Sequence, residues 1–212
     1  MKKVDKLKRI QGTIDYTLRT PKVLQALARL NFPKEDVLAG SSIFDEVIFL
    51  EDAQQKEYGD QYKATEELTQ ARRDARALYM KHLELARIGF RNHRAFYKTL
   101  LLSGNRQGDL FGWLSQARTF YTHIHGGKDV MKKLGVAEAE LKQGKEMVET
   151  VIEAYHVRQK EGSEALTATQ QRDRAMAKLD AWMRRFSQTA RLAFIEDPDT
   201  LKALGLKKKV MV

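Results

Sequence analysis

Residues 64–91, which read ATEELTQARRDARALYMKHLELARIGFR, contain the pattern that decides the fold. Small and apolar residues recur there, together with one histidine, at alternating spacings of four and three. This heptad spacing lies along one face of a helix and favours a left-handed supercoil with a neighbouring helix. The positions of this seam are Ala64, Leu68, Ala71, Ala75, Leu78, His82, Leu85 and Gly89. The stretch therefore predicts a long helix packed closely against another one.

The same pattern returns 104 residues later in the chain. A gapless comparison of residues 30–102 with 134–206 gives 17 identities in 73 positions. We interpret this match as a tandem duplication, with a first helical repeat at 1–104 and a second at 105–212 that pack as one domain. The seam of the second copy is Ala168, Arg172, Ala175, Leu179, Trp182, Phe186, Thr189 and Ala193.

Both copies turn polar ahead of the seam, at residues 53–63 and 157–167. Each polar stretch contains a glycine, so we predict a helix–helix turn there and an antiparallel hairpin in each copy. The fold class is then all-α: a four-helix bundle with internal two-fold pseudo-symmetry. Its long helices lie at about 34–58, 64–91, 138–160 and 165–194, and short helices at 4–19, 21–30, 110–124 and 128–134 cover one end. The alternative is one continuous helix of about 57 residues in each copy.

Capping residues mark several helix ends. Thr20-Pro21 fits an N-cap and first helical position, and Pro33 can open an acidic helix. Asp197-Pro198 restarts a short helix, which Gly205 ends.

Composition excludes several classes of protein. The 212 residues include no cysteine, so a disulfide framework, a thiolate metal site and a cysteine nucleophile are excluded. No run approaches the roughly 18 apolar residues of a membrane span. The start, MKKVDKLKRIQG, lacks the apolar region of a signal peptide. We therefore expect a soluble, cytoplasmic protein.

The net charge of +10 alternates along the chain. Residues 30–67 hold 10 acidic and 3 basic residues, whereas residues 68–128 hold 3 acidic and 11 basic residues. An acidic helix beside a basic one cancels much of the field, so we interpret the charges mainly as faces that set helix pairing.

Candidate metal ligands are scattered. Glu153-x-x-His156 has the spacing of a di-iron bundle, but the matching residues of the first copy are Phe49 and Asp52. His123-x-His125 has a spacing that directs its two rings apart on a helix. His82 lies on the seam, which predicts a core histidine that bonds to a neighbour. We therefore expect no metal, no cofactor and no catalytic residues.

Two further groups of residues resemble parts of functional sites. Gly126-Gly127-Lys128 resembles the end of a phosphate-binding loop, but Thr122 and Asp129 stand where that loop needs a glycine and a serine or threonine. The aromatic residues around the junction of the copies are expected to cap the bundle rather than to stack on bases. They are Phe111, Trp113, Phe120 and Tyr121.

Arginines at the end of the basic helix make the best candidate site for an anion or a partner. They are Arg87, Arg91 and Arg94, and Arg191 matches Arg87 in the second copy. Arginine at a helix C-terminus is also favoured by the helix dipole, and an adjacent acidic helix can pair with it.

Three segments carry a resemblance to a known family. LELARIGF at 83–90, SQTARLAF at 187–194 and LKALGL at 201–206 resemble an uncharacterised bacterial family of duplicated all-α helical-bundle proteins. The family has no assigned activity, so the resemblance implies a duplicated fold and no site residues.

Two functional hypotheses remain. The first is a non-enzymatic structural or protein-interaction bundle that binds a protein partner or self-associates through its charged faces. The alternative is a nucleic-acid-associated protein that uses the basic helix 68–98 and the basic N-terminus.

Overall fold

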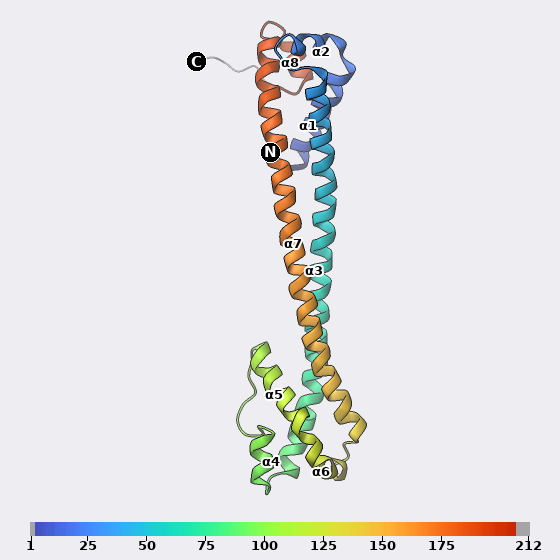
Figure 1. The fold of residues 1–212 in the computed structure, drawn as a ribbon, viewed down its shortest axis with the longest axis vertical. Coiled ribbons are helices and arrows are strands. Elements are labelled where there is room, and N and C mark those ends of the chain that lie inside the picture. Colours follow the sequence, from blue (N-terminus) through green and yellow to red (C-terminus); the bar gives the residue numbers. More distant parts are fainter. Residues whose placement is uncertain (1–2, 207–212) are drawn as a thin grey trace. The chain divides into compact units, whose positions relative to one another are not determined.

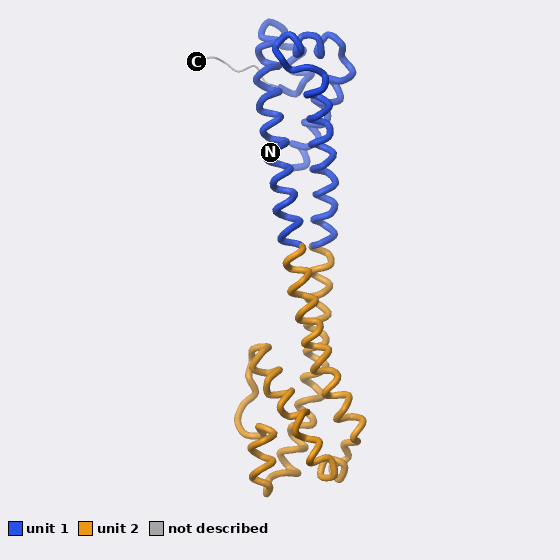
Figure 2. The backbone as a smooth tube through the Cα atoms, viewed as in Figure 1, with its two compact units in different colours: residues 1–57, 165–212 blue, residues 58–164 orange. Residues whose placement is uncertain are grey.

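The structure is a computed structural model, and it describes residues 3–206. All regular elements in that range are helices, which confirms the all-α class. The helices form two compact units (Figure 2). Unit 1 comprises residues 1–57 and 165–212, and unit 2 comprises residues 58–164. Each unit takes residues from both expected repeats; the outer limits of those repeats lie outside the described residues, and the repeat boundary at 104/105 stays a prediction.

Two helices are much longer than the rest. α3 runs from Lys34 to Gly89 and α7 from Glu138 to Ala193, each with 56 residues (Figure 1). The predicted turns at 53–63 and 157–167 are therefore wrong, and the continuous-helix alternative is what the structure contains. The four expected long helices are two helices.

The helices continue through the polar stretches for local reasons. Gly59 and Gly162 lie within α3 and α7, and neither has the positive φ that a glycine turn would use. A glycine costs about 1 kcal/mol in a helix interior, which long helical flanks outweigh. No proline interrupts either stretch. The polar side chains also find partners: the Nε2 of Gln54 donates to the Oγ1 of Thr169 at 2.9 Å.

Unit 1 contains α1 (Lys3–Arg19), α2 (Pro21–Ala28), α8 (Pro198–Ala203), the first part of α3 and the last part of α7. Ion pairs show that α3 and α7 are antiparallel here, because Asp36 pairs with Arg185 and Glu46 with Lys178. The core gathers side chains from all five segments. They include Ile10, Leu27, Val47, Leu179, Phe186 and Leu201, and Phe32 joins them from the turn after α2.

Unit 2 contains the last part of α3, α4 (Arg94–Thr99), α5 (Leu110–His123), the 3-10 helix η1 (Ile124–Gly127), α6 (Lys128–Lys133) and the first part of α7. Its core is rich in aromatic rings. Fully buried members include Tyr79, Phe90, Trp113 and Phe120. The short helices predicted from the sequence are present in both units, with ends shifted by a few residues.

Predicted end signals are confirmed at several positions. Pro21 opens α2 after the N-cap Thr20, and α3 begins directly after Pro33. The side chain of Asp197 caps α8 by accepting from the backbone N–H of Thr200 at 3.0 Å. Gly205 follows α8 with a φ of +68°.

The seam positions are buried in part. Ala64, Ala75 and His82 are buried as the heptad pattern predicts, and Ala71 is half-buried. The buried face is wider than the seam, because Tyr79, Leu83 and Ala86 are also buried. Tyr79 packs against Trp113, Phe120 and Tyr121 of α5, a contact that a two-helix pattern does not include.

Several structural features recur at a spacing of 104 residues. α3 and α7 start and end 104 residues apart, and so do α4 and α8. A positive φ occurs at Asn31 and again at Gly135, and at Leu101 and again at Gly205.

Candidate functional site

Arg87 lies near the C-terminal end of α3, in unit 2. Its Nε donates to the carbonyl oxygen of Leu102 at 2.8 Å, and its Nη2 donates to the carbonyl oxygen of Gly104 at 2.9 Å. The guanidinium therefore satisfies backbone acceptors in the segment that follows α4. Two of the five N–H donors of Arg87 are thus used to tie α3 to this segment, which gives the residue a structural role in unit 2.

The other predicted arginines have different surroundings. Arg91 and Arg94 are exposed, just past the end of α3 and at the start of α4. Arg191 belongs to unit 1, where it lies on α7. The predicted set is thus divided, with three residues in unit 2 and one in unit 1.

Arg191 lines a cavity of about 340 Å³ in unit 1 together with other basic side chains. Among the residues that the structure describes, its buried Nε atom has no hydrogen-bond partner. The sequence match with Arg87 does not predict this difference.

A buried polar cluster in unit 2 is centred on His82. The ring Nδ1 lies 3.0 Å from the hydroxyl oxygen of Tyr121, and Nε2 lies 3.3 Å from Oε1 of Glu140. The Nζ of Lys81 donates to the same carboxylate oxygen at 2.8 Å. The predicted core histidine is confirmed. Its partners lie 39 and 58 residues away on α5 and α7, so sequence spacing could not identify them.

Burial and hydrogen bonding shift the pKa values in this cluster. Desolvation lowers the pKa of His82, although the hydrogen bond to Glu140 opposes the shift. Hydrogen bonds from Lys81 and then His82 lower the pKa of the Glu140 carboxyl group. Burial raises the pKa of Tyr121. The histidine is therefore held neutral, which suits a packed polar core.

Arg106 makes a second set of polar contacts at the core of unit 2. Arg106 donates to the hydroxyl of Tyr79 at 2.9 Å and to the carbonyl oxygen of Leu101 at 2.8 Å. Burial raises the pKa of Tyr79, and the bond from Arg106 opposes the shift. Both polar contacts position loops and side chains within the unit.

Three histidines that were candidate metal ligands in the sequence line two cavities of unit 2. His123 and His156 line one of about 540 Å³, beside Arg118 and Tyr155. His125 lines another of about 560 Å³. His123 and His125 thus line different cavities, as their spacing predicts. Glu153 and His156 are both exposed, as expected of surface residues.

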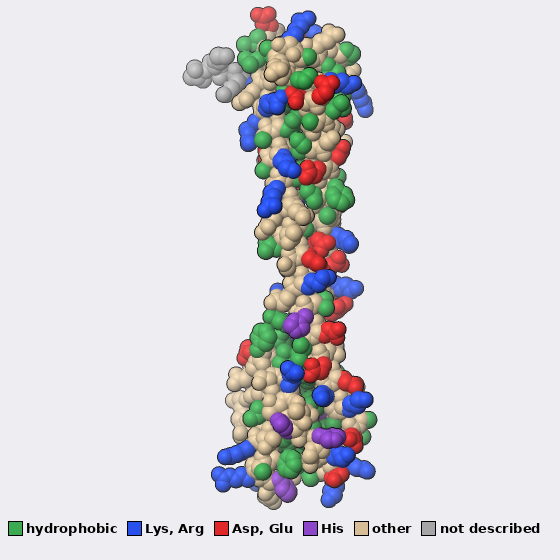
Figure 3. Space-filling model, in the orientation of Figure 1, with side chains coloured by type: hydrophobic (Ala, Val, Ile, Leu, Met, Phe, Trp, Pro, Cys, Tyr) green, Lys and Arg blue, Asp and Glu red, His purple; other side chains and the backbone are tan. Residues whose placement is uncertain are grey.

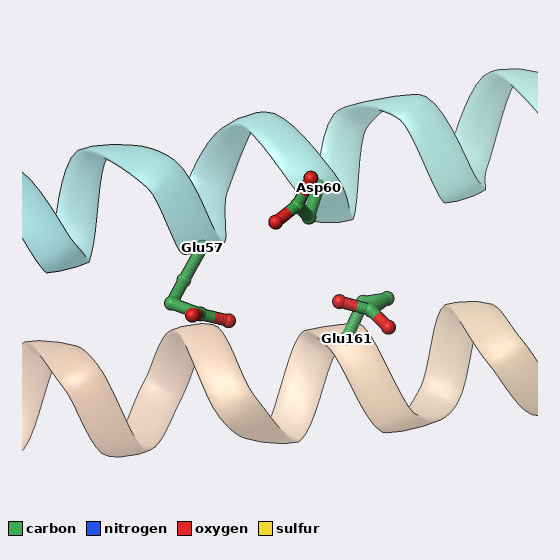
Figure 4. A group of neighbouring side chains, drawn as sticks. All are labelled: Glu57, Asp60 and Glu161. Carbon is green, nitrogen blue, oxygen red and sulfur yellow. The ribbon is translucent and has the colours of Figure 1, made fainter.

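Carboxylates approach one another on the long helices. Asp60 on α3 and Glu161 on α7, both in unit 2, carry oxygens within 4.8 Å of each other, and Figure 4 shows the two side chains facing. Glu57, the last residue of unit 1 in α3, precedes Asp60 by about one turn. Lys160 lies beside this pair, with its Nζ 3.7 Å from Glu161. Neighbouring carboxylates alone do not define a metal site.

The aromatic residues around the expected junction divide by burial. Trp113, Phe120 and Tyr121 are buried in unit 2, as expected of capping residues. Phe111 is exposed and packs edge-on against Tyr155, with ring centroids 5.1 Å apart. Gly127 is needed for packing, because a Cβ there would lie 2.4 Å from the ring of Phe90.

Within residues 3–206, no helix combines the length and the apolar character that crossing a bilayer requires. Comparison of the chain with known protein families, with curated proteins and with solved structures found no match to any of them.

Proposed function

We propose that this chain is a non-enzymatic structural and protein-interaction protein that associates with further copies of itself. One observation carries the proposal: Ile88 and Leu192 are each 67 % exposed. Ile88 comes two residues after the fully buried Ala86, and Leu192 comes two residues after the fully buried Ala190. Burial of these two large apolar side chains against another protein is favourable.

We also propose that the chain contains an internal repeat of 104 residues. Support comes from the equal spacing of α3 and α7, of α4 and α8, and of the positive-φ residues. It also comes from matched backbone bonds: Phe32 to Leu27 in one copy and Val136 to Met131 in the other. A repeat supplies one exposed apolar residue to each unit, and two such residues allow assembly beyond a dimer.

Some charged side chains of the long helices form ion pairs with each other within unit 1. Glu46 and Glu51 of α3 pair with Lys178 and Arg172 of α7. Figure 3 shows basic and acidic side chains interspersed on the face of unit 1 that it displays. The two charges of each ion pair cancel. We therefore assign the intermolecular contact to Ile88 and Leu192 and give the charged faces a secondary role.

Sedimentation velocity at about 0.05 M and about 0.5 M salt tests this proposal. An apolar contact predicts self-association that persists at the higher salt and is lost in the double variant Ile88→Glu, Leu192→Glu. Phe49→Glu is a matched control, since Phe49 is 71 % exposed but its counterpart in the second copy is Glu153, so no apolar residue is repeated there. A monomer at every concentration, or equal effects of the control and the double variant, would overturn the proposal.

A second candidate is the nucleic-acid-associated protein. Arg72, Arg73 and Arg76 line a cavity of about 290 Å³ in unit 2, and all three belong to the basic part of α3. Closely spaced arginines are favourable contacts for a phosphate backbone. Arg72 also donates to the carbonyl oxygen of Gly108 at 2.6 Å, which leaves Arg73 and Arg76 as the better candidates for phosphate contacts.

Electrophoretic shift of duplex DNA and of RNA tests the second candidate. It predicts binding that falls steeply with salt and is weakened by Arg73→Gln with Arg76→Gln. No shift at about 0.05 M salt would exclude it.

A further inference from the structure

A cavity in unit 1, bordered by α1 and α7, gathers four basic side chains. Lys6 and Arg9 come from α1, and Arg184 and Arg191 from α7. Asp180 and the largely buried Ser187 also line the cavity, whose volume is about 340 Å³. Four cations around one carboxylate leave an excess of positive charge.

The ion pairing within the cavity is uneven. Lys6 forms an ion pair with Asp180, since the Nζ of Lys6 lies 2.6 Å from Oδ1 and 2.8 Å from Oδ2 of Asp180. No described acidic side chain forms an ion pair with Arg9, Arg184 or Arg191. These three guanidinium groups are therefore available to an anion from outside.

Among the residues that line the cavity, Arg191 has a buried hydrogen-bond donor without an acceptor. Its Nε is buried and has no hydrogen-bond partner among the described residues. A buried N–H without an acceptor is costly, and such groups in native proteins call for a specific explanation. Arg87, the matched arginine of unit 2, uses its own Nε to bond the carbonyl of Leu102 at 2.8 Å. The same residue type at the same place in a long helix is thus satisfied in unit 2 and unsatisfied in unit 1.

The walls of the cavity are held in place. A Cβ on Gly205 would lie 3.1 Å from the Cγ of Arg9, so the stem of Arg9 rests against this glycine. Thr13, one turn after Arg9, donates to the carbonyl oxygen of Leu204 at 2.9 Å. These contacts fix α1 against the end of α8, and they place Arg9 on a rigid element.

We propose that this cavity binds a small anion with a phosphate group, held by Arg9, Arg184 and Arg191. Guanidinium forks match phosphate oxygens in bidentate pairs. Three cations beyond the Lys6–Asp180 pair suit a phosphate monoester, which carries nearly two negative charges at neutral pH, better than a single carboxylate. The volume is at the lower end of small-molecule sites and accommodates a phosphate together with a small attached group.

Isothermal titration calorimetry on the full chain tests the proposal with inorganic phosphate, glycerol 3-phosphate and acetate at about 0.05 M salt. Both phosphate compounds are expected to bind, and acetate about tenfold more weakly or not at all. The comparison of the two phosphates separates a free phosphate site from a site for a phosphomonoester. Arg191→Gln should weaken binding by about tenfold or more, because it removes a charged hydrogen-bond donor.

Lys8→Gln is the matched control. Lys8 is an exposed lysine next to Arg9 on α1 that does not line the cavity, so this variant removes the same charge elsewhere on the helix. Its affinity for phosphate should stay within about twofold of that of the wild type. Arg184→Gln changes an exposed side chain and serves as the second variant if Arg191→Gln fails to fold.

Three outcomes would overturn the proposal. The first is no binding of either phosphate up to about 10 mM. The second is equal weakening by Lys8→Gln and Arg184→Gln, which would indicate attraction to the general charge of unit 1. The third is tight binding of duplex DNA with no binding of the small phosphates, which would assign the arginines to a nucleic-acid backbone.

Discussion

The Nδ1 atom of His82 lies 3.0 Å from the hydroxyl oxygen of Tyr121, with both side chains buried in unit 2. The pair joins α3 to α5, and the second ring nitrogen of His82 faces Glu140 on α7. One histidine thus connects three helices, so its charge state bears directly on the stability of the unit.

Stability should fall on mild acidification because of His82. Burial lowers the pKa of His82 below its ordinary value of 6.5. The unfolded chain therefore binds more protons as the pH falls through about 6.5; the stability contributed by the neutral ring is present above that pH and lost below it. We expect the thermal midpoint to fall between about pH 7.5 and pH 5.5, and to fall less in His82→Gln. His123→Gln, at an exposed histidine, should keep the wild-type dependence. Identical pH profiles for His82→Gln and the wild type would contradict this assignment.

Gly144 should not tolerate a side chain. A Cβ there would lie 2.3 Å from the hydroxyl oxygen of Tyr121, so Gly144→Ala should destabilise by about 1–3 kcal/mol through overpacking. Denaturant unfolding measures the change. The ring atoms Cζ and Cε1 of Tyr121 would also lie 2.4 and 2.5 Å from this Cβ, so the matched background is Tyr121→Ala, which removes the whole ring. Gly144→Ala should cost less in that background, and an unchanged cost would place the strain elsewhere.

Gly59 should respond in the opposite way. Nothing lies within 4 Å of a Cβ built on this glycine, which is inside α3. Gly59→Ala should therefore stabilise by about 0.5–1 kcal/mol, since alanine favours a helix interior. A destabilised Gly59→Ala protein in the same unfolding measurement would instead support a turn at this position.

Arg87 should matter for stability and its neighbours should not. Arg87→Gln loses the bonds to the carbonyls of Leu102 and Gly104, and we expect a loss of about 1–3 kcal/mol in the free energy of unfolding. Arg91→Gln and Arg94→Gln change exposed side chains and should leave this free energy unchanged. Equal losses in all three variants would refute the structural role of Arg87.

Overpacking at the seam should depend on burial. Ala175 is 1 % exposed in the core of unit 1, so Ala175→Leu should destabilise by about 1–3 kcal/mol. Ala71, its counterpart in the repeat, is only half-buried, and Ala71→Leu should cost less. Thermal melts of the two variants compare them, and a larger loss for Ala71→Leu would contradict the observed packing.

Helix type and most helix ends could be predicted from the sequence because they depend on local chemistry. Pro21, Pro33, Asp197 and Gly205 act through their own backbone or side chain within one turn. The turn expected at 53–63 was wrong because polar composition alone does not end a helix. A stop needs a proline, a positive φ or a competing cap, and Gly59 provides none of them in α3.

The candidate sites could not be predicted from the sequence, because they depend on contacts between residues that are far apart in the chain. Arg87 and Arg191 match in sequence, yet one bonds two carbonyls and the other has a buried Nε without an acceptor. The cavity beside Arg191 needs Lys6 and Arg9 from the opposite end of the chain. No local motif links those residues, so only the folded unit 1 brings them together.

The division of the chain into units also sets an order of events during synthesis. All residues of unit 2 lie within 58–164, so this unit can fold once that stretch has left the ribosome. Unit 1 has to wait for residues from 165 onward, because Ile10 and Leu27 share their core with Phe186 and Leu204. The apolar faces of α1 and α2 therefore lack their core partners from α7 until residues from 165 onward have been synthesised, and uncovered apolar surface of this kind favours aggregation.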